Sequence, residues 1–577
     1  MLTNVLLSPQ RLRDWFFKCD PIPDALAMRG NLPTLLFLLG IVFYCLYLLL
    51  LQPGWVLSGE MWAEMATNYY PISNSSSLVV KLFSTDSGYI PLLQRLLAAL
   101  GQSFGPPASS IPYFYTWSAI ILTGVMVASF CLKPFRVLVK NDLLRFFTAL
   151  AVLLVADFET RTFINFTYFG AFFVAIISAQ ALVEKSNQVS WWAWFIPVIM
   201  VSKPALLSVL PAMVLAALVS KSRFRKITLL VLLLCLVQVV TMIMSHSSGM
   251  VVSTSNFTIF EKLHSTIKYF LGFLGFFFAG KAVSVEFSIL RGLGIILFCI
   301  IVLCIKRNNA SALILVGLIL LFSNVLINSF TLSDYWNLNM ARLMAGQLYR
   351  HNIVCFFGVV LIVVGSICTF LSDNNERIKF LKAVPPFLFL IWFYFSGWYT
   401  IMGLMNRSPN SPIIDNSQWQ KMAYIIDSGG PVCVPINPFG WIFGRNCFQL
   451  NPDISWGKPY SYKNFSTNEQ LNSVAIVPPP IILNKNLMSL AVLAKPRMQT
   501  PRDIDGKAII EMKDGSTKHM YGNRKLPASG GLLMFTTNYT IPTSDIRSII
   551  LKFSVPVDIG YITNEPNDNP AVLWLGN

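Results

Sequence analysis

Residues 33–51 read PTLLFLLGIVFYCLYLLLL, an apolar run that no charged residue interrupts. About 20 such residues cross the hydrocarbon core of a bilayer as one helix. Four basic residues precede the run, Arg11, Arg13, Lys18 and Arg29, and no small-residue cleavage site follows it. A signal peptide would carry such a site, so we predict an uncleaved anchor with its N-terminus in the cytoplasm.

Similar runs recur along the first two thirds of the chain. Of the 577 residues, 54% are hydrophobic and only 12% are charged, whereas soluble chains carry about 25% charged residues. The run 267–280 is too short to span and is predicted to be a re-entrant half-helix or an interfacial helix. The sequence therefore predicts a polytopic α-helical membrane protein with about 11 transmembrane helices. These are expected at 33–51, 112–132, 143–157, 164–183, 191–202, 204–220, 227–244, 285–305, 311–328, 352–371 and 381–400.

The loops between these runs differ in charge. Alternate loops hold clusters of Lys and Arg, as in Lys221, Arg223, Arg225 and Lys226, whereas the opposite loops 158–163 and 245–266 hold one basic residue each. Positive loops stay in the cytoplasm, so an odd number of crossings places the C-terminus outside. The net charge of +17 is spread over these loops. Nucleic-acid binding uses one concentrated basic face, and we therefore expect no nucleic-acid partner.

Composition divides the chain into a membrane body, residues 1–404, and an exported domain, residues 405–577. The exported part alternates short β-prone runs with turns such as Asp514-Gly515, which predicts a β-rich sandwich or jelly roll. Such a module could contact glycans or serve only as a structural lid. Its two cysteines, Cys433 and Cys447, are predicted to form a disulfide in an oxidising compartment; two reduced, buried thiols are the alternative.

Acidic residues gather on the outer side. The first outer loop, about 52–111, contains the helix-compatible run Gly59-Glu60-Met-Trp-Ala-Glu64. Residues four apart share one face of a helix, so both carboxylates are expected to point the same way unless they are simply solvated. Asp157 and Glu159 follow an apolar run on the same side. They mark either a helix end that meets water or a functional group at membrane depth.

Basic residues on this outer side need a physical reason. Lys203 lies in a tight turn between two apolar runs, and Arg342 and Arg350 lie in one short segment. Lys and Arg bind phosphate through charge-assisted hydrogen bonds, so a lipid phosphate is one explanation; interfacial snorkelling is the other. Phosphate-loop, dinucleotide and Ser/His/Asp patterns are lacking in the sequence. The predicted activated substrate is therefore a lipid phosphate held in the membrane.

This layout, with an acidic first outer loop and an exported C-terminal domain, resembles the GT-C glycosyltransferases. The run from Glu60 to Tyr70, EMWAEMATNYY, looks like the serotype-converting glucosyltransferases of enterobacterial phages and their hosts. The resemblance implies inverting transfer of a sugar, glucose in that subfamily, from undecaprenyl phosphate. The acceptor would be lipid-linked O-antigen, part of lipopolysaccharide, or a related glycan, at the periplasmic face of a bacterial inner membrane.

The resemblance also implies roles for single residues. Glu60 or Glu64 would be the general base, and we favour Glu60 because it follows Gly59 near the start of the loop. Asp157 and Glu159 would orient the acceptor or hold a divalent cation, although no cofactor is required. An O-antigen polymerase or ligase and a lipid-linked glycan transporter are the alternatives. The carrier phosphate would be bound by Lys203, Arg342, Arg350 and Arg161.

Overall fold

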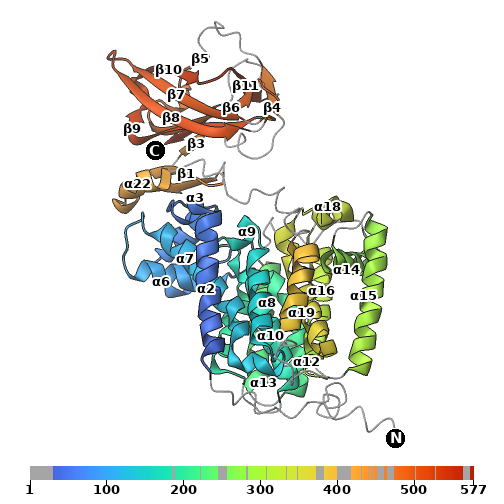
Figure 1. Cartoon of the computed structure of the whole chain (residues 1–577). Helices are drawn as coiled ribbons and strands as arrows, with labels where there is room; N and C mark the ends of the chain where they lie inside the picture. Colours follow the sequence, from blue (N-terminus) through green and yellow to red (C-terminus); the bar gives the residue numbers. More distant parts are fainter. Residues whose placement is uncertain are drawn as a thin grey trace. The chain divides into compact units, whose positions relative to one another are not determined.

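The computed structural model gives the chain two compact units, which we describe separately (Figure 1). Unit 1 comprises residues 1–52, 72–100 and 116–410, and unit 2 comprises residues 53–71, 101–115 and 411–577. The predicted boundary at 404/405 lies outside the described residues. The structure describes residues 30–184, 189–220, 223–244, 257–280, 284–306, 308–332, 334–346, 348–371, 383–398, 418–429, 432–438, 441–445, 448–450, 460–463, 473–500, 502–526, 528–562 and 572–576.

Unit 1 is helical. The following helices belong wholly or mostly to this unit: α2 (Leu32–Leu51), α5 (Leu78–Phe83), α6 (Leu92–Ser103), α7 (Ile111–Ala128), α8 (Asp142–Leu154), α9 (Phe158–Arg161), α10 (Gly170–Val183), α11 (Ile196–Val201), α12 (Leu210–Val219), α13 (Arg223–Met244), α14 (Ile259–Ala279), α15 (Val285–Ile305), α16 (Ser311–Thr331), α17 (Asp334–Asn337), α18 (Met340–Met344), α19 (Tyr349–Leu371) and α20 (Val384–Trp392). Short 3₁₀ turns precede three of them: η5 (Phe166–Phe169), η6 (Trp191–Phe195) and η7 (Pro204–Val209).

The prediction of a helical membrane body is confirmed in its coarse form. Among the described residues, 7 helices are long and apolar enough to cross a membrane. The predicted crossings 191–202, 204–220 and 381–400 form shorter apolar helices, and 143–157 forms only the 13 residues of α8. Pro197, Pro204 and Pro211 each open a new helical turn. Because proline has no backbone N–H to donate inside a helix, the runs 191–202 and 204–220 are divided into shorter pieces.

Burial separates an inner helix from outer ones. Every residue of α10 is buried, and this helix packs against α12, α16 and α19. By contrast, α2, α13 and α15 expose many large apolar side chains, among them Leu50, Leu236 and Ile301. Apolar surface of this extent on a soluble monomer would be unfavourable in water. The distribution is that expected of helices whose outer faces contact lipid.

One expected half-helix is longer than predicted. Residues 267–280 form the second part of α14, which begins at Ile259. Thr258 caps its first turn: the Thr258 hydroxyl accepts the N–H of Glu261, and the Glu261 carboxylate accepts the N–H of Thr258. This reciprocal capping box starts a helix ahead of the apolar residues. The helix is therefore longer than hydropathy alone indicates, because hydropathy does not detect a polar first turn, and its interfacial placement stays a prediction.

Unit 2 is built on antiparallel strands. The prediction of a β-rich domain is confirmed in its coarse form, but the described strands form one continuous ten-stranded sheet and a separate β1–β2 hairpin. Strand pairing runs without a break through the ten strands, with β6 paired to β9 on one side and to β11 and β12 on the other; the finer sandwich or jelly-roll arrangement stays a prediction. The strands are β1 (Val432–Ile436), β2 (Trp441–Arg445), β3 (Phe448–Leu450), β4 (Tyr460–Lys463), β5 (Ser473–Ile476), β6 (Asn486–Pro496), β7 (Arg502–Met512), β8 (Thr517–Leu526), β9 (Gly531–Pro542), β10 (Ile546–Phe553), β11 (Val557–Ile562) and β12 (Val572–Gly576).

The start of the predicted first outer loop, residues 53–71, belongs to unit 2. It contains α3 (Pro53–Val56), the π-helix η2 (Met65–Tyr69) and the short helix α4 (Tyr70–Ser73), which runs on past the end of this segment. Gly59 and Ala63 have φ angles of 65° and 43°, and Trp62 forms a β-bridge with Asn437. A left-handed φ interrupts a right-handed helix. The expected helix carrying both Glu60 and Glu64 on one face is therefore not formed.

Candidate functional site

Polar and charged side chains of unit 1 meet where α9 follows α8. The side chain of Asp157 caps the short helix α9: its Oδ1 accepts the backbone N–H of Thr160 at 3.0 Å and also the Thr160 hydroxyl. Asp157 is only 6% exposed. Asp is among the preferred N-cap residues because its carboxylate satisfies otherwise unpaired N–H groups. One carboxylate oxygen is thus already occupied in holding the loop.

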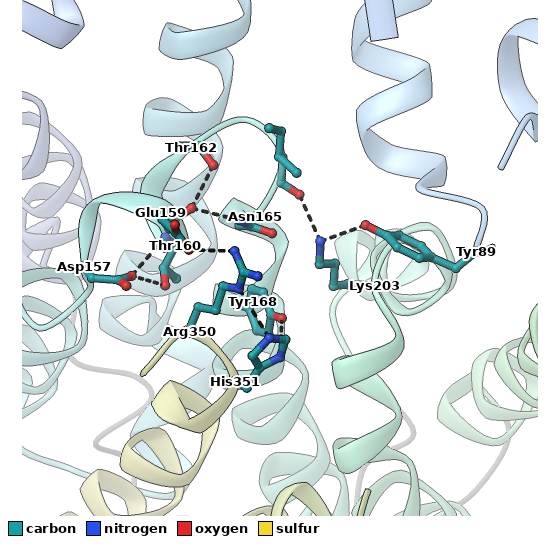
Figure 2. Close-up of polar contacts among 11 residues, drawn as sticks. Tyr89, Asp157, Glu159, Thr160, Thr162, Asn165, Tyr168, Lys203, Arg350 and His351 are labelled. Atoms are coloured by element: carbon teal, nitrogen blue, oxygen red, sulfur yellow. Dashed lines mark hydrogen bonds and ion pairs between the residues drawn. The ribbon is translucent and has the colours of Figure 1, made fainter. Parts of the chain in front are cut away.

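Glu159 projects from α9 toward the first turn of α19. Its Oε2 lies 2.6 Å from Nη1 of Arg350, and the two side chains are 47% and 40% exposed (Figure 2). An ion pair this exposed contributes about 0–1 kcal/mol to stability. The pair therefore holds a carboxylate and a guanidinium together at a solvent-accessible place, with little stabilising value of its own.

The residue after Arg350 extends this contact inward. Nε of Arg350 donates to Nε2 of His351 at 3.3 Å, and Nδ1 of His351 lies 3.3 Å from the hydroxyl of Tyr168. Tyr168 belongs to η5, just before the buried helix α10. Tyr168 and His351 lie below Glu159 in Figure 2, and their rings meet edge to face with centroids 6.3 Å apart. Arg350, His351 and Tyr168 thus form one hydrogen-bonded chain.

Lys203 approaches the same tyrosine from the turn before η7. Its Nζ donates to the Tyr89 hydroxyl at 2.7 Å and, at 3.5 Å, to the Ile164 carbonyl. The Nζ atom also lies 5.7 Å from the ring centroid of Tyr168, within reach of a cation–π interaction. Lys203 is 9% exposed. Tyr168 therefore stands between the two cations, Lys203 and Arg350.

Arg161 ends α9 and has an unusual hydrogen-bond inventory. It is 4% exposed; Nη2 donates to the Leu154 carbonyl at 3.2 Å, and the guanidinium lies over the ring of Tyr47. Its buried Nε and Nη1 have no hydrogen-bond partner among the described residues. Leaving a buried donor without an acceptor costs about 1–3 kcal/mol, and more when the donor is charged. Arg161 is therefore a cation with donors available for an anionic ligand.

Arg342, the remaining predicted phosphate ligand, lies apart from this cluster. It is exposed on α18, where Asn339 caps its backbone N–H. No contact within the described part of the chain joins its side chain to Glu159, Lys203 or Arg350. The sequence grouped Arg342 with Arg350 because they are eight residues apart, but the chain turns between α18 and α19.

Glu60 lies in unit 2 and is 2% exposed. Its Oε2 accepts the backbone N–H of Trp419 at 3.1 Å, and its Oε1 accepts that of Gln420 at 3.4 Å. Both N–H groups belong to the first turn of α22 (Gln418–Asp427). A carboxylate at a helix N-terminus is favoured by the helix dipole and by the free N–H groups. Glu60 thus has a structural contact, while half-buried Glu64 starts the helical turn of η2. Their assignment as the base stays a prediction.

Two further predictions concern the disulfide and a divalent cation. Cys447 and the side chain of Cys433 lie outside the described residues, so the disulfide stays a prediction. For a divalent cation, Asp157 and Glu159 are the proposed ligands, and each already has a hydrogen-bond or ion-pair partner. No group of three or more His, Cys, Asp or Glu side chains that could hold a metal is found in the described ranges.

The sequence analysis did not assign roles to Tyr168, His351 or Tyr89. Each is an ordinary residue of an apolar segment until the fold brings them beside a charge, and Tyr168 and His351 are 183 residues apart. One signal was present: His351 is one of only 4 histidines in the chain and directly follows Arg350.

Comparison of the chain with protein-family models, curated proteins and solved structures finds no match. The function is therefore argued from this cluster of unit 1 and from the chemistry of its residues.

Proposed function

We propose that this chain is a membrane glycosyltransferase that moves a sugar, glucose by the resemblance, from a polyprenyl-phosphate carrier to a hydroxyl of an O-antigen-type glycan. The reaction would take place on the non-cytoplasmic face of a bacterial inner membrane. One observation carries the proposal: Arg161, Lys203 and Arg350 gather at one end of the unit 1 helices together with the half-exposed carboxylate of Glu159. Three cations beside one accessible carboxylate suit a reaction that releases a phosphate, and buried donors of Arg161 have no partner among the described residues.

The cations would bind the donor and stabilise the leaving group. Arg161 and Lys203 are almost fully buried, and a charge acts more strongly where water is excluded. When the bond between the anomeric carbon and the phosphate oxygen breaks, the carrier phosphate leaves with the electron pair. Donors already aimed at this developing charge lower the barrier without further reorganisation.

Glu159 is the carboxylate that best suits the role of general base. Its Oε2 is held by Arg350, while its Oε1 has no partner among the described residues and the side chain is 47% exposed. It would take the proton of the acceptor hydroxyl as that oxygen forms the new bond to the anomeric carbon. Attack opposite the leaving phosphate inverts the anomer. By contrast, both oxygens of Glu60 accept backbone N–H groups.

The test is sugar transfer by the purified full-length chain, with a polyprenyl-phosphate sugar as donor. Loss of a general base lowers the rate by about 10²- to 10⁴-fold, so Glu159→Gln should lower kcat by that amount while normal expression persists. Glu60→Gln and Glu64→Gln, its matched controls, should retain most of the turnover. If Glu60→Gln abolishes transfer and Glu159→Gln does not, Glu60 is the base, as the sequence predicts. A wild-type chain that transfers no sugar from any such donor would contradict the function itself.

A further inference from the structure

The hydrogen bonds of His351 determine where its proton lies. Nε of an arginine carries a hydrogen and can only donate. Because Nε of Arg350 points at Nε2 of His351 at 3.3 Å, Nε2 must be the unprotonated acceptor. The neutral ring then carries its proton on Nδ1. Both ring nitrogens have partners in this orientation, whereas a flipped ring would place carbon atoms there.

This tautomer fixes the direction of the next hydrogen bond. Nδ1–H of His351 donates to the hydroxyl oxygen of Tyr168, at 3.3 Å. Tyr168 therefore acts as an acceptor toward His351 and keeps its own O–H proton for another partner. Within the described ranges, this hydroxyl has no second hydrogen bond, although Tyr168 is only 2% exposed. A buried donor left without an acceptor is costly, so a ligand oxygen is the natural partner.

The surroundings of Tyr168 specify the charge of that ligand. Lys203 lies 5.7 Å from the ring centroid on one side, and Arg350 is joined through His351 on the other (Figure 2). An O–H donor between two cations suits an anionic oxygen. A neutral sugar hydroxyl would gain less from these charges than an anionic oxygen would.

We infer that Tyr168 is a further ligand of the carrier phosphate, donating its O–H to a non-bridging phosphate oxygen, and that His351 is the positioning residue that directs this proton. The inference rests on the proposed function, since it takes the anion to be a polyprenyl phosphate. Hydrogen bonds to a charged acceptor change affinity by roughly ten- to a hundredfold. His351 acts through Tyr168 and itself touches no substrate.

The first experiment compares two ligands that share the polyprenyl chain and differ in the phosphate group. Full-length protein in detergent is titrated with undecaprenyl phosphate and with undecaprenol. Tyr168→Phe should weaken binding of the phosphate by roughly ten- to a hundredfold and leave binding of the alcohol unchanged. Tyr349→Phe is the matched control, because the Tyr349 hydroxyl already donates to the Val155 carbonyl at 2.7 Å. It should lower thermal stability while keeping the preference for phosphate.

Two substitutions test the positioning role. His351→Asn places an amide N–H near the former Nδ1, whereas His351→Leu has no donor; both lose the contact to Arg350. We expect the Asn variant to keep the preference for phosphate and the Leu variant to lose it as Tyr168→Phe does. Tyr168→Phe combined with His351→Leu should cause no further loss, since residues acting through one another are not additive.

The outcomes separate this inference from the proposed function. If the wild-type chain prefers undecaprenyl phosphate but Tyr168→Phe keeps that preference, Tyr168 is no ligand and the inference fails alone. If the Asn and Leu variants lose the preference equally, His351 acts through Arg350 and its positioning role is refuted. If the wild-type chain binds phosphate and alcohol equally, the phosphate site of the proposed function fails as well.

Discussion

At the scale of single residues, burial distinguishes cations that the sequence treats alike. Arg161 is 4% exposed and has donors without partners in the described part of the chain, whereas Arg342 is exposed on α18. Arg161→Lys keeps the positive charge but removes the guanidinium fork, which is the part suited to phosphate. We expect affinity for undecaprenyl phosphate to fall by about tenfold or more. Titration of Arg342→Lys under the same conditions should give the wild-type affinity, and equal losses in both variants would contradict the assignment.

The charged members of the candidate site could be predicted from sequence, and its neutral members could not. Asp157, Glu159 and Lys203 are conspicuous because ionisable groups at the ends of apolar runs are rare. Tyr168 gives no such signal, since a tyrosine in an apolar helix is ordinary. The contact of Glu60 with Trp419 spans 359 residues of sequence, and no local pattern reports a partner that distant.

At the scale of elements, the Glu60 cap gives a local prediction. Glu60→Gln replaces one accepting oxygen by an amide that cannot accept, so the first turn of α22 loses one of its two carboxylate contacts. Loss of a capping group costs about 0.5–2 kcal/mol. Hydrogen exchange of the amides of Trp419 and Gln420, followed by mass spectrometry, should become faster. Glu64→Gln should leave these amides unchanged; unchanged exchange in Glu60→Gln would show that the cap contributes nothing.

Helix packing in unit 1 depends on close backbone contact at glycine. A Cβ added at Gly292 of α15 would collide with the backbone carbonyl of Leu271 in α14, and one at Gly275 would collide with that of Ser288. Gly294, on the same helix as Gly292, has open space. Overpacking typically costs about 1–3 kcal/mol, so Gly292→Ala should lower the thermal stability of the detergent-solubilised protein. Gly294→Ala is the control and should match the wild type. Equal stability of both variants would show that α14 and α15 separate freely.

Positions of helices were easier to predict than their limits. Hydropathy finds α2, α13, α15 and α16 within a few residues, because spanning a membrane requires a long apolar run. It misses the polar first turn of α14 and the proline breaks around η7, which depend on capping and on missing N–H groups. Strand positions in unit 2 were partly predicted, but their pairing was not. Pairing joins strands as distant as β5 and β10, and alternation along a strand does not specify its partner.

At the scale of the whole molecule, the distribution of basic residues predicts one orientation. The segment Lys221 to Lys226 contains four basic residues in six positions, and the loop 158–163 contains only Arg161. Because Lys and Arg in short loops are retained in the cytoplasm, residues near Lys226 should be inside. The same rule, with an odd number of crossings, places Asn577 outside.

Reporter fusions test this orientation. Alkaline phosphatase, which folds only in an oxidising compartment, should be active when fused after Asn577 and silent when fused after Lys226. A fluorescent protein that matures only in the cytoplasm should give the opposite pattern at both sites, which controls for expression. An additional fusion after Lys81, in the first outer loop, should be active with alkaline phosphatase. The reverse pattern would place Glu159, Lys203 and Arg350 on the cytoplasmic side, where soluble nucleotide sugars are present. A lipid-phosphate donor would then no longer be the required substrate, and the proposed reaction would lose its main physical argument.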